Sequence, residues 1–269
     1  KLYSEIWLPY LASILESLQQ ISKAQTVVMR LSRSLQNSDK HNLTDGEVIY
    51  GKLENDVVTF IEHDVKFSAN VIKGHKTGYF LDHRANRKRV GELSKGKSVL
   101  DVFSYAGGFS VHALVGRAKS VTSLDISKQA LEVAKENAAL NPHSGEHKIL
   151  AADAFEGLQK LRDKGQKFDL IIIDPPSFAK KATEKERALK SYTRLAKLGT
   201  QLIAKDGILV LCSCSSRIRR DEFFDTVLGE LERSKKDFDV LEKTYHDTDH
   251  QIGFDEGAYL KSVYVQISN

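Results

Sequence analysis

The sequence predicts an α/β fold in which a mostly parallel β-sheet, covered by helices on both faces, follows a smaller N-terminal α+β domain. From about residue 97, short apolar strands alternate with amphipathic helices across short connections, which is typical of a parallel sheet. Segments such as 168–173 are apolar almost throughout, as expected for strands buried on both faces. Before residue 75, apolar and polar residues alternate around polar turns. We therefore expect two domains, at 1–75 and 76–269.

Composition limits the classes of protein to which the chain can belong. Of its 269 residues, 41% are hydrophobic and 28% are charged, as in a globular protein. Since no run of about 18 apolar residues occurs, we expect no membrane span. The net charge of +4 and the pI of about 8.8 are compatible with a nucleic-acid partner. Two cysteines cannot build a disulfide scaffold, so we expect a reducing, cytoplasmic location.

The N-terminal domain is predicted to begin with an amphipathic helix over residues 9–22, with Pro9 in its first turn. Its apolar stripe consists of Leu11, Ile14, Leu15, Leu18 and Ile21. Residues 26–32 follow as a strand, 32–46 as a polar loop, and 47–71 as a meander of strands. Because the chain lacks an initiator Met, we expect a further segment upstream.

The larger domain continues with alternating strands and helices, each bounded by turn residues or caps. Strands are expected at 98–104, 120–127, 147–153, 168–176, 207–215, 238–245 and 259–268. Helices are expected at 109–118, 128–141, 154–165, 184–203 and 219–234. Parallel strands of such a sheet present their carboxyl ends, and hence a ligand site, at one edge.

Three carboxylates lie at or near these strand ends. Asp101 belongs to the first strand, Asp125 ends the second, and Asp153 follows the third. Asp125 comes 24 residues after Asp101, close to the spacing at which an acidic side chain binds ribose hydroxyls. Read alone, Asp101 could equally be a turn or cap residue. The three positions together favour a nucleoside site.

The turn after the first strand distinguishes between nucleotides. A dinucleotide site needs three glycines to approach a pyrophosphate, but Phe103 and Tyr105 occupy the earlier places, and only Gly107 and Gly108 remain. A carboxylate at Asp101 repels an anion and attracts a cation. S-adenosylmethionine, which carries a sulfonium and an amino group, therefore fits better than NAD.

A further carboxylate, Asp174, directly follows an apolar strand and precedes Pro175 and Pro176. The prolines cannot extend the strand, so they hold the carboxylate on a rigid corner at the ligand edge. An ordinary strand-ending turn is the alternative. We expect Asp174 to contact a ligand, because an acidic group after an apolar run is costly unless it reaches water or a substrate.

Both cysteines, Cys212 and Cys214, end the next strand along the chain. A thiolate that adds to carbon 6 of a pyrimidine makes carbon 5 able to attack a methyl sulfonium. We expect one thiol to be this nucleophile, Asp174 to hold the ring nitrogen, and Cys212 to be a buried packing residue. Arg217, Arg219 and Arg220 follow, and we expect them to bind RNA phosphates and to favour the thiolate. Two thiols and scattered histidines predict no metal site.

Several motifs together resemble one family. They are "GYFLDHRANR" (78–87), "LDVFSYAGGFSVHA" (100–113), "DPPSF" (174–178), "CSCS" (212–215) and "DHQIGFDEGAYLKSVYV" (249–265). The chain resembles, over nearly all of residues 45–269, the class I S-adenosylmethionine-dependent RNA methyltransferases that include the bacterial 5-methylcytosine methyltransferase of 23S rRNA. The resemblance implies a Rossmann-like catalytic sheet, usually with a PUA domain upstream, and 23S rRNA or the assembling large ribosomal subunit as partner. It allows a homodimer.

The resemblance also implies roles for individual residues. The catalytic positions are Cys214 and Asp174. The cofactor-binding positions are Asp82, Arg84, Asp101, Phe103, Ser104, Gly107, Asp125, Ile126, Asp153, Ala154 and Asp174. Relatives with two thiols carry one after the paired prolines, where this chain has Ser177. Cys214 matches the nucleophile position better than Cys212, but the choice between them stays open.

Two other functions are compatible with the sequence. One is an N-methyltransferase acting on guanine in rRNA, in which both cysteines only pack. The other is an RNA-binding protein with a degenerate cofactor site. The basic run that consists of Arg84, Arg87, Lys88 and Arg89 has two interpretations as well, a solvated helix face or a phosphate track that leads to the pocket.

Overall fold

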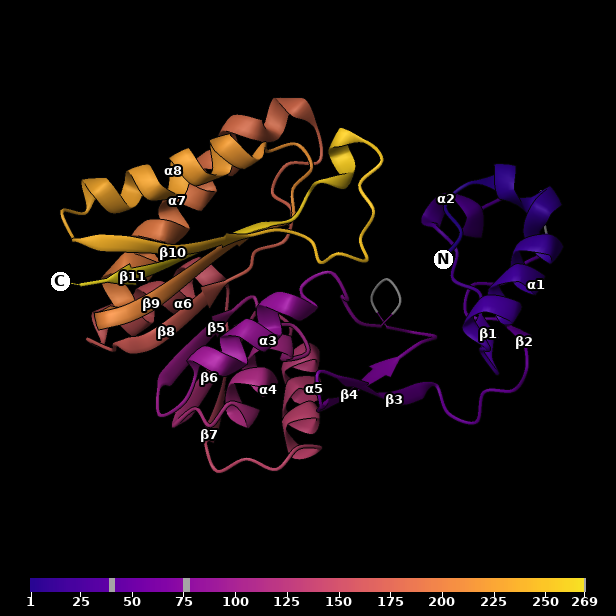
Figure 1. Cartoon of the computed structure of the whole chain (residues 1–269), viewed down its shortest axis with the longest axis horizontal. Coiled ribbons are helices and arrows are strands. Elements are labelled where there is room, and N and C mark those ends of the chain that lie inside the picture. The colour runs from indigo at the N-terminus through magenta and orange to yellow at the C-terminus, as the bar shows by residue number, and fades with distance from the viewer. Residues whose placement is uncertain (39–41, 75–77, 269) are drawn as a thin grey trace. The chain divides into compact units, whose positions relative to one another are not determined.

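The computed structural model of the chain describes residues 1–38, 42–74 and 78–268 (Figure 1). The chain forms two compact units. The N-terminal unit consists of Lys1–Ile61 and Lys66–Leu81, and the C-terminal unit consists of Glu62–Val65 and Asp82–Asn269. The boundary that we predicted between residues 75 and 76 lies outside the described residues. The structure divides the chain several residues later, and it adds 62–65 to the C-terminal unit.

A seven-stranded sheet forms the centre of the C-terminal unit, as predicted for an α/β fold. Its strands are β5 (Ser98–Val102), β6 (Ser120–Asp125), β7 (Glu146–Ala151), β8 (Phe168–Ile173), β9 (Ile203–Ser213), β10 (Phe238–Thr244) and β11 (Lys261–Ile267). They are ordered β10-β11-β9-β8-β5-β6-β7, and those from β7 to β9 are parallel. The last strand, β11, is antiparallel to both β9 and β10.

Helices cover both faces of this sheet (Figure 1). One layer contains α3 (Arg84–Leu93), α4 (Gly108–Val115) and α5 (Lys128–Ala139). The other contains α6 (Ala154–Asp163), α7 (Lys185–Leu202) and α8 (Arg220–Arg233). Two short 3-10 helices, η2 (Ala182–Glu184) and η3 (Asp255–Gly257), lie in the connections. The helix α3 was not among the predicted elements, because its sequence is mostly polar and basic.

The register of the central strands decides which side chains meet at the ligand edge. Val102 in β5 pairs with Ile173 in β8, and Ile173 pairs with Leu211 in β9. These three residues belong to the core under α6–α8. Because side chains alternate along a strand, Asp101, Asp174 and Cys212 are directed to the face that carries α3–α5. Parallel pairing thus brings together residues that are far apart in the sequence.

The N-terminal unit is smaller and less regular than the sequence predicted. Its elements are η1 (Glu5–Tyr10), α1 (Leu11–Ser22), β1 (Val27–Val28), α2 (Arg33–Gln36), β2 (Val48–Tyr50), β3 (Val57–Glu62) and β4 (Val65–Asn70). The expected strand at 26–32 shortens to two residues, and a short helix forms in the expected loop. The predicted helix begins as 3-10 turns around Pro9.

The apolar stripe of α1 is not buried within the described residues, contrary to the expectation from its amphipathic pattern. Ile21 is 84% exposed, and Ile14 and Leu18 are also exposed. The N-terminal unit buries only a small cluster of Met29, Leu31 and Leu35, against which Leu11 packs. Such a cluster is too small to cover a three-turn helix.

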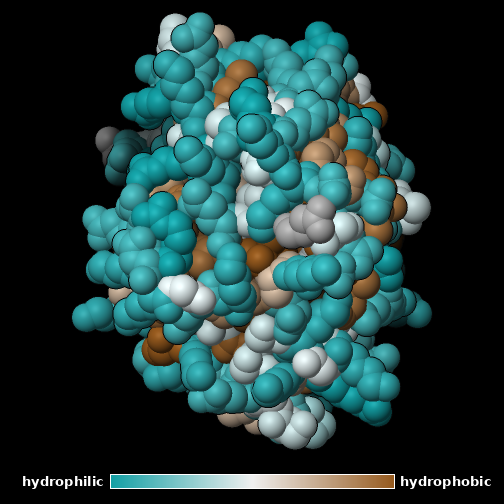
Figure 2. Space-filling view, turned by 90° about the vertical axis from the view of Figure 1, so that its left-hand side faces the viewer, coloured by the Kyte–Doolittle hydropathy of each residue, from teal (hydrophilic) through white to brown (hydrophobic). Residues whose placement is uncertain are grey.

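Hydrophilic residues predominate on the side of the molecule drawn in Figure 2, where apolar residues form small, separate groups. Among the described helices, none combines the length and the apolar character that crossing a membrane requires. This finding agrees with the expectation of no membrane span.

A buried ion pair anchors the tip of the β3–β4 segment within the C-terminal unit. Arg87 in α3 donates two hydrogen bonds of 2.7 Å to the two carboxylate oxygens of Glu62, and His112 in α4 lies 3.1 Å from the same carboxylate. All three side chains are almost completely buried. Burial alone would raise the pKa of Glu62, but the hydrogen bonds from Arg87 and His112 lower it to about 2.

We expect Arg87→Met to lower the free energy of unfolding by about 3–5 kcal/mol, because it leaves the Glu62 carboxylate buried without its partner. The matched control is Arg89→Met, which breaks a partly exposed pair with Glu242 and should cost about 1 kcal/mol or less. Urea denaturation followed by circular dichroism compares the two. Equal losses would contradict a dominant role for the buried pair.

The same pair gives the stability a pH dependence of known sign. The folded-state pKa of Glu62 lies below its ordinary value of 4.5, so its stabilisation is complete above that value. It is lost as the pH falls from about 4.5 towards 2. Glu62→Gln should remove this contribution and flatten the acid side of the stability curve.

Candidate active site

Asp101 in β5 is the most buried carboxylate at the ligand edge, with 1% of its surface exposed. Its Oδ2 accepts hydrogen bonds from the Ser110 amide at 3.0 Å and from the Ser110 hydroxyl at 2.6 Å. Its Oδ1 is buried and has no hydrogen-bond partner among the described residues. Burial raises the pKa of the carboxyl to about 7 against the Ser110 hydrogen bonds, and Asp174 and Asp125 add to the rise. One oxygen thus helps to cap α4, and the other is left for a ligand.

The turn between β5 and α4 has a strained backbone where it faces the ligand edge. Phe103 and Tyr105 adopt positive φ angles of 65° and 47°, which is uncommon for such bulky residues. Between them, the Ser104 hydroxyl is buried and has no hydrogen-bond partner within the described structure. Gly107 has a φ of 78°, and an added Cβ would lie 2.8 Å from the Ala134 Cβ. A side chain at this position would be strained, so glycine is favoured there.

Asp125 ends β6 beside this turn. Its Oδ2 accepts a hydrogen bond from the Tyr105 amide at 2.9 Å, and its Oδ1 accepts one from the Ser127 amide at 2.8 Å. Each oxygen keeps a lone pair for a further donor, as a pair of ribose hydroxyls would require. Ile126 follows with 74% of its surface exposed.

Asp153 has a local structural function in addition to any contact with a ligand. Its Oδ1 accepts hydrogen bonds from the amides of Phe155 and Glu156, so it is the N-cap of α6. Ala154, the next residue, is buried. Both residues were expected in the cofactor site, and the cap was not predicted.

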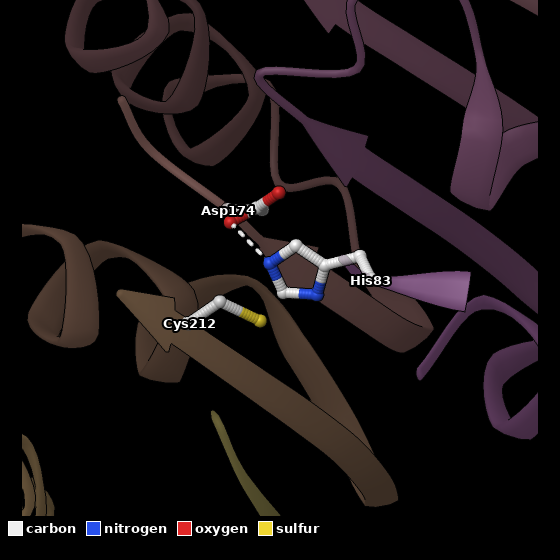
Figure 3. Close-up of side chains that lie close together, drawn as sticks. All are labelled: His83, Asp174 and Cys212. Atoms are coloured by element: carbon white, nitrogen blue, oxygen red, sulfur yellow. Dashed lines mark ion pairs between the residues drawn. The ribbon is translucent and has the colours of Figure 1, made fainter. Parts of the chain in front are cut away.

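Asp174 lies directly after β8 and is fixed from two sides. Its amide donates a hydrogen bond of 3.3 Å to the carbonyl of Val102, which continues the pairing of β8 with β5. Its Oδ1 lies 3.2 Å from Nε2 of His83, the N-cap residue of α3 (Figure 3). His83 is 4% exposed, and sequence reasoning missed it because a single histidine beside Asp82 and Arg84 carries no pattern of its own.

A hydrogen-bond network orients the His83 ring. The Asn86 amide nitrogen lies 3.1 Å from His83 Nδ1, while the Asn86 oxygen accepts hydrogen bonds from Thr244 and Tyr264. Nδ1 therefore acts as the acceptor, and the ring proton resides on Nε2, which faces Asp174. The ring is thus held 3.2 Å from the Asp174 carboxylate, although its Nε2 makes no hydrogen bond within the described residues.

Cys212 lies beneath this pair. Its sulfur, His83 Nε2 and an Asp174 oxygen all lie within 4.8 Å of one another, and Figure 3 shows the three side chains converging. Such a group could in principle hold a metal ion, although the sequence predicted no metal site. Burial raises the pKa of the Cys212 thiol well above its ordinary value, and the charge of Asp174 adds to the rise. Because metals bind the thiolate, these surroundings favour a protonated packing residue, and the absence of a metal stays a prediction.

Cys214 lies beyond the end of β9 and is only partly buried. Its sulfur is 3.7 Å from the carbonyl oxygen of Pro175, the residue that follows Asp174. The structure thus brings Asp174 and both thiols to one place, as we predicted from the order of the strands. The depth of the two thiols also agrees with the expectation that Cys212 packs in the core, since Cys212 is 1% exposed and Cys214 is only partly buried.

The predicted basic track is largely neutralised by acidic partners. In α3, Arg84 pairs with Asp247 at 2.9 Å and Asp249 at 3.0 Å. Arg87 pairs with Glu62, and Arg89 pairs with Glu242 and Glu92, whereas Lys88 is exposed. Of the two interpretations of this basic run, the structure therefore favours a solvent-exposed helix face with ion pairs over a track that binds phosphates.

The arginines after Cys214 have partners as well, which alters their expected role at the thiol. Arg217 lies 3.8 Å from Glu256 and Arg219 lies 3.4 Å from Asp221. Arg220 stacks 4.1 Å above the Tyr245 ring. Because each arginine already has a partner in the protein, the three are poor candidates for stabilising a thiolate. Binding of RNA phosphates by these arginines stays a prediction.

Asp82, the other predicted cofactor residue of this segment, accepts a hydrogen bond of 2.9 Å from the hydroxyl of Tyr259. Tyr259 belongs to the C-terminal motif 249–265. Two motifs that lie far apart in the sequence therefore meet here. Contacts of Asp82 and Arg84 with the methionine part of a cofactor stay predictions.

A basic groove of about 710 Å³ lies elsewhere in the C-terminal unit, where β8 and β9 begin. Its cations are Arg162, Lys167, Lys197, Arg233 and Lys236. These residues surround the C-terminal ends of α6, α7 and α8, and Lys167 donates a hydrogen bond of 2.6 Å to the carbonyl of Gln201 in α7. Cations at helix C-termini satisfy the last carbonyls and the helix dipole, which accounts for the groove without a ligand.

The residues at the ligand edge fit S-adenosylmethionine. Two buried acceptor groups, Asp101 Oδ1 and Ser104 Oγ, have no hydrogen-bond partner in the described part of the chain. Asp125 offers a carboxylate for the two ribose hydroxyls, and Gly107 allows the backbone to approach closely. Acceptors and carboxylates match a ligand with hydroxyl, amino and sulfonium groups and do not match a pyrophosphate.

We expect Asp101→Asn to raise the dissociation constant for S-adenosylmethionine about 10-fold to 100-fold at pH 8, because it removes a charge and keeps the shape. With a pKa of about 7, the Asp101 carboxyl is ionised above that pH and protonated below it. The dissociation constants of the wild type and of Asp101→Asn should therefore become similar near pH 6. Titration calorimetry at the two pH values provides the measurement.

The control for this substitution is Asp169→Asn. Asp169 lies at the opposite end of β8, where it accepts hydrogen bonds from Ser98. Its replacement should leave the dissociation constant unchanged. Wild-type affinity of Asp101→Asn at pH 8 would contradict a contact between Asp101 and the cofactor.

Comparison with solved structures supports the fold. A putative SAM-dependent methyltransferase from Streptococcus mutans matches 98% of this chain and 67% of its own, with a TM-score of 0.83 and 21% identity. A putative methyltransferase complexed with SAH matches the same shares with a TM-score of 0.80 and 21% identity. At such identities the likeness establishes the Rossmann-like α/β fold.

Sequence comparisons identify the family. A ribosomal RNA large subunit methyltransferase from Deinococcus radiodurans is 44% identical over 269 residues, which are 99% of this chain and 66% of the relative. Ribosomal RNA large subunit methyltransferase I from Aeromonas salmonicida is 37% identical over 222 residues, 81% of this chain and 56% of the relative. The chain thus spans between half and two thirds of these relatives. A family model for S-adenosylmethionine-dependent methyltransferases matches residues 8–263, and the chain belongs to that family.

Proposed function

We propose that the chain methylates carbon 5 of a cytosine in large-subunit ribosomal RNA, with Cys214 as the nucleophile. The observation that carries the proposal is the position of the Cys214 sulfur, 3.7 Å from the carbonyl of Pro175 and next to Asp174, at the tip of β9. Two groups that pyrimidine-C5 chemistry requires, a thiol and an acid, thus stand on neighbouring strands. The names of the relatives from Deinococcus radiodurans and Aeromonas salmonicida support ribosomal RNA as the substrate.

Cys214 is better suited to the nucleophilic role than Cys212. A nucleophile has to ionise and to reach the base, and Cys214 is partly exposed beyond the end of the strand. Cys212 is buried, and both burial and Asp174 hold its thiol in the protonated form. The position of the first thiol of two-cysteine relatives is occupied by Ser177, which donates a hydrogen bond to the carbonyl of Ala179.

The proposed reaction begins with the thiolate of Cys214, which forms a bond to carbon 6 of the cytosine ring. The added electron pair makes carbon 5 nucleophilic, and Asp174 in its protonated form donates a hydrogen bond to the ring nitrogen at which negative charge develops. Bound S-adenosylmethionine supplies the methyl group as a sulfonium electrophile. After carbon 5 has taken up the methyl group, a base removes its proton. The bond from carbon 6 to sulfur then breaks, and the thiolate is regenerated.

His83 supports Asp174 in this proposal. Its Nε2 lies 3.2 Å from the carboxylate, and Asn86 contacts Nδ1 on the other side of the ring. Asp174 can therefore keep one position while the base enters. Removal of His83 would free the carboxylate to rotate.

The partner and the setting follow from the same proposal. The substrate is 23S rRNA, either naked or within the assembling large subunit, and reduced thiols are consistent with a cytoplasmic enzyme. Pairing with a second copy stays a prediction from the sequence.

We expect Cys214→Ala to lower the rate of methyl transfer by about a thousandfold or more, because no thiolate is left to add to carbon 6. Binding of S-adenosylhomocysteine should stay within about twofold of the wild type. Incorporation of a radioactive methyl group into ribosomal RNA measures the first quantity and calorimetry the second.

Trapping on RNA that contains 5-fluorocytidine tests the covalent step directly. Fluorine at carbon 5 cannot leave as a proton, so the adduct persists and is found by mass spectrometry on the peptide that contains Cys214. The matched variant Cys212→Ala should still form it. Full activity of Cys214→Ala, with no adduct, would favour methylation of a guanine nitrogen. A lack of cofactor binding by the wild type would favour a degenerate RNA-binding protein.

A further inference from the structure

Lys261, the first residue of β11, has an unusual environment for a lysine. It is 0% exposed, and a lysine is almost never fully buried without partners. Its ammonium donates hydrogen bonds to three backbone carbonyls: those of Ser215 and Ile218, both at 2.6 Å, and that of Tyr259 at 3.0 Å. The three protons of the ammonium are all used, so the group cannot take up a proton or bind a substrate.

Two of these carbonyls belong to the turn that follows Cys214. Ser215 and Ile218 lie in the connection between β9 and α8, and the Ile218 amide also donates to the Ser215 carbonyl at 3.4 Å. Ser215 is itself fixed, since its amide donates to the Ser213 hydroxyl and its own hydroxyl donates to the Ala179 carbonyl. Lys261 therefore ties the turn after the thiol to β11.

Charge gives Lys261 a second connection to the thiol. Burial lowers the pKa of Lys261 to about 8, and the negative charge of Cys214 is the main effect that opposes this fall. At neutral pH the ammonium is thus charged. Coulombic attraction is mutual, so the buried ammonium stabilises a thiolate at Cys214 as much as the thiolate stabilises the ammonium.

A positive charge beside Cys214 favours the ionised form of its thiol. Tyr192 and Cys212 also face Asp174 and Cys214, and neither supplies a cation. Among the charged groups near Lys261, Arg220 and Glu222 act in opposite directions on its ammonium. Arg217 and Arg219, which we had expected to favour the thiolate, pair with carboxylates instead.

We propose that Lys261 is a positioning residue for the nucleophile: its buried ammonium holds the 215–218 turn in place and provides the counter-charge for the thiolate of Cys214. This inference rests on the proposed function of Cys214. It assigns a role to a residue that touches neither the cofactor nor the RNA base.

The test measures the ionisation of Cys214 without using RNA. In the Cys212→Ser background, Cys214 is the sole thiol, so the rate of alkylation by iodoacetamide as a function of pH reports its thiolate. Lys261→Met should move the midpoint of this curve upward by about one pH unit or more. Methyl transfer at pH 7 should fall at least about tenfold, in line with the smaller thiolate fraction.

A second variant separates charge from hydrogen bonding. Lys261→Gln keeps amide donors for the carbonyls and removes the charge, so its midpoint should also move upward. Lys205→Met, at an exposed position near the start of β9, is the matched control and should leave the midpoint unchanged. Binding of S-adenosylhomocysteine and the thermal melting curve show which variants are folded.

The outcomes are distinguishable. A wild-type midpoint in folded Lys261→Gln or Lys261→Met would overturn the counter-charge. Should Lys261→Met fail to fold, Lys261→Gln alone decides. If the midpoint moves as expected but Cys214→Ala keeps full methyl transfer, the counter-charge stands as a property of the thiol and the proposed nucleophilic role falls.

Discussion

Backbone pairing of β8 with both β5 and β9 is the constraint on which the site depends. Val102, Ile173 and Leu211 are level across these strands, so the residues just beyond them meet at one edge. Alternation along each strand then directs Asp101, Asp174 and Cys212 to one face and the apolar neighbours to the core under α6–α8. A slip of one residue in either pair would turn an acid or a thiol into the core. The site is therefore as stable as the sheet itself.

Burial of polar groups gives this edge its chemistry. Asp101 has a raised pKa because it is desolvated, and one of its oxygens has no hydrogen-bond partner among the residues that the structure describes. Elsewhere the buried charges are compensated: Glu62 by Arg87 and His112, and Lys261 by three carbonyls. A buried polar atom is costly unless a hydrogen bond satisfies it. The unsatisfied oxygen of Asp101 therefore agrees with the prediction that this residue contacts a ligand.

Much of the fold was predictable from the sequence, since strands such as 168–173 and helices such as 128–139 carry strong periodic signals. The helix α3 escaped prediction because two of its four buried residues, Asn86 and Arg87, are polar and therefore interrupt the apolar periodicity by which a helix is recognised. Asp174 and Cys214 were predictable because they end strands. His83 and Lys261 were not, because their roles come from tertiary contacts with residues about 90 and 46 positions away. Contacts between residues so far apart in the sequence leave no local pattern from which they could be predicted.

The division of roles between the two cysteines follows from where β9 ends. Cys212 still pairs within the sheet, opposite Ser262, and is enclosed by the helix layer that carries His83. Two residues later the strand has ended, and the chain turns under the control of Lys261, so Cys214 is partly exposed. The charge of Asp174 helps to hold the Cys212 thiol in its protonated form, whereas we propose that the buried ammonium of Lys261 acts on Cys214. The same C-x-C spacing thus yields one buried packing residue and one partly exposed sulfur, because a difference of two residues moves the side chain from the sheet to its edge.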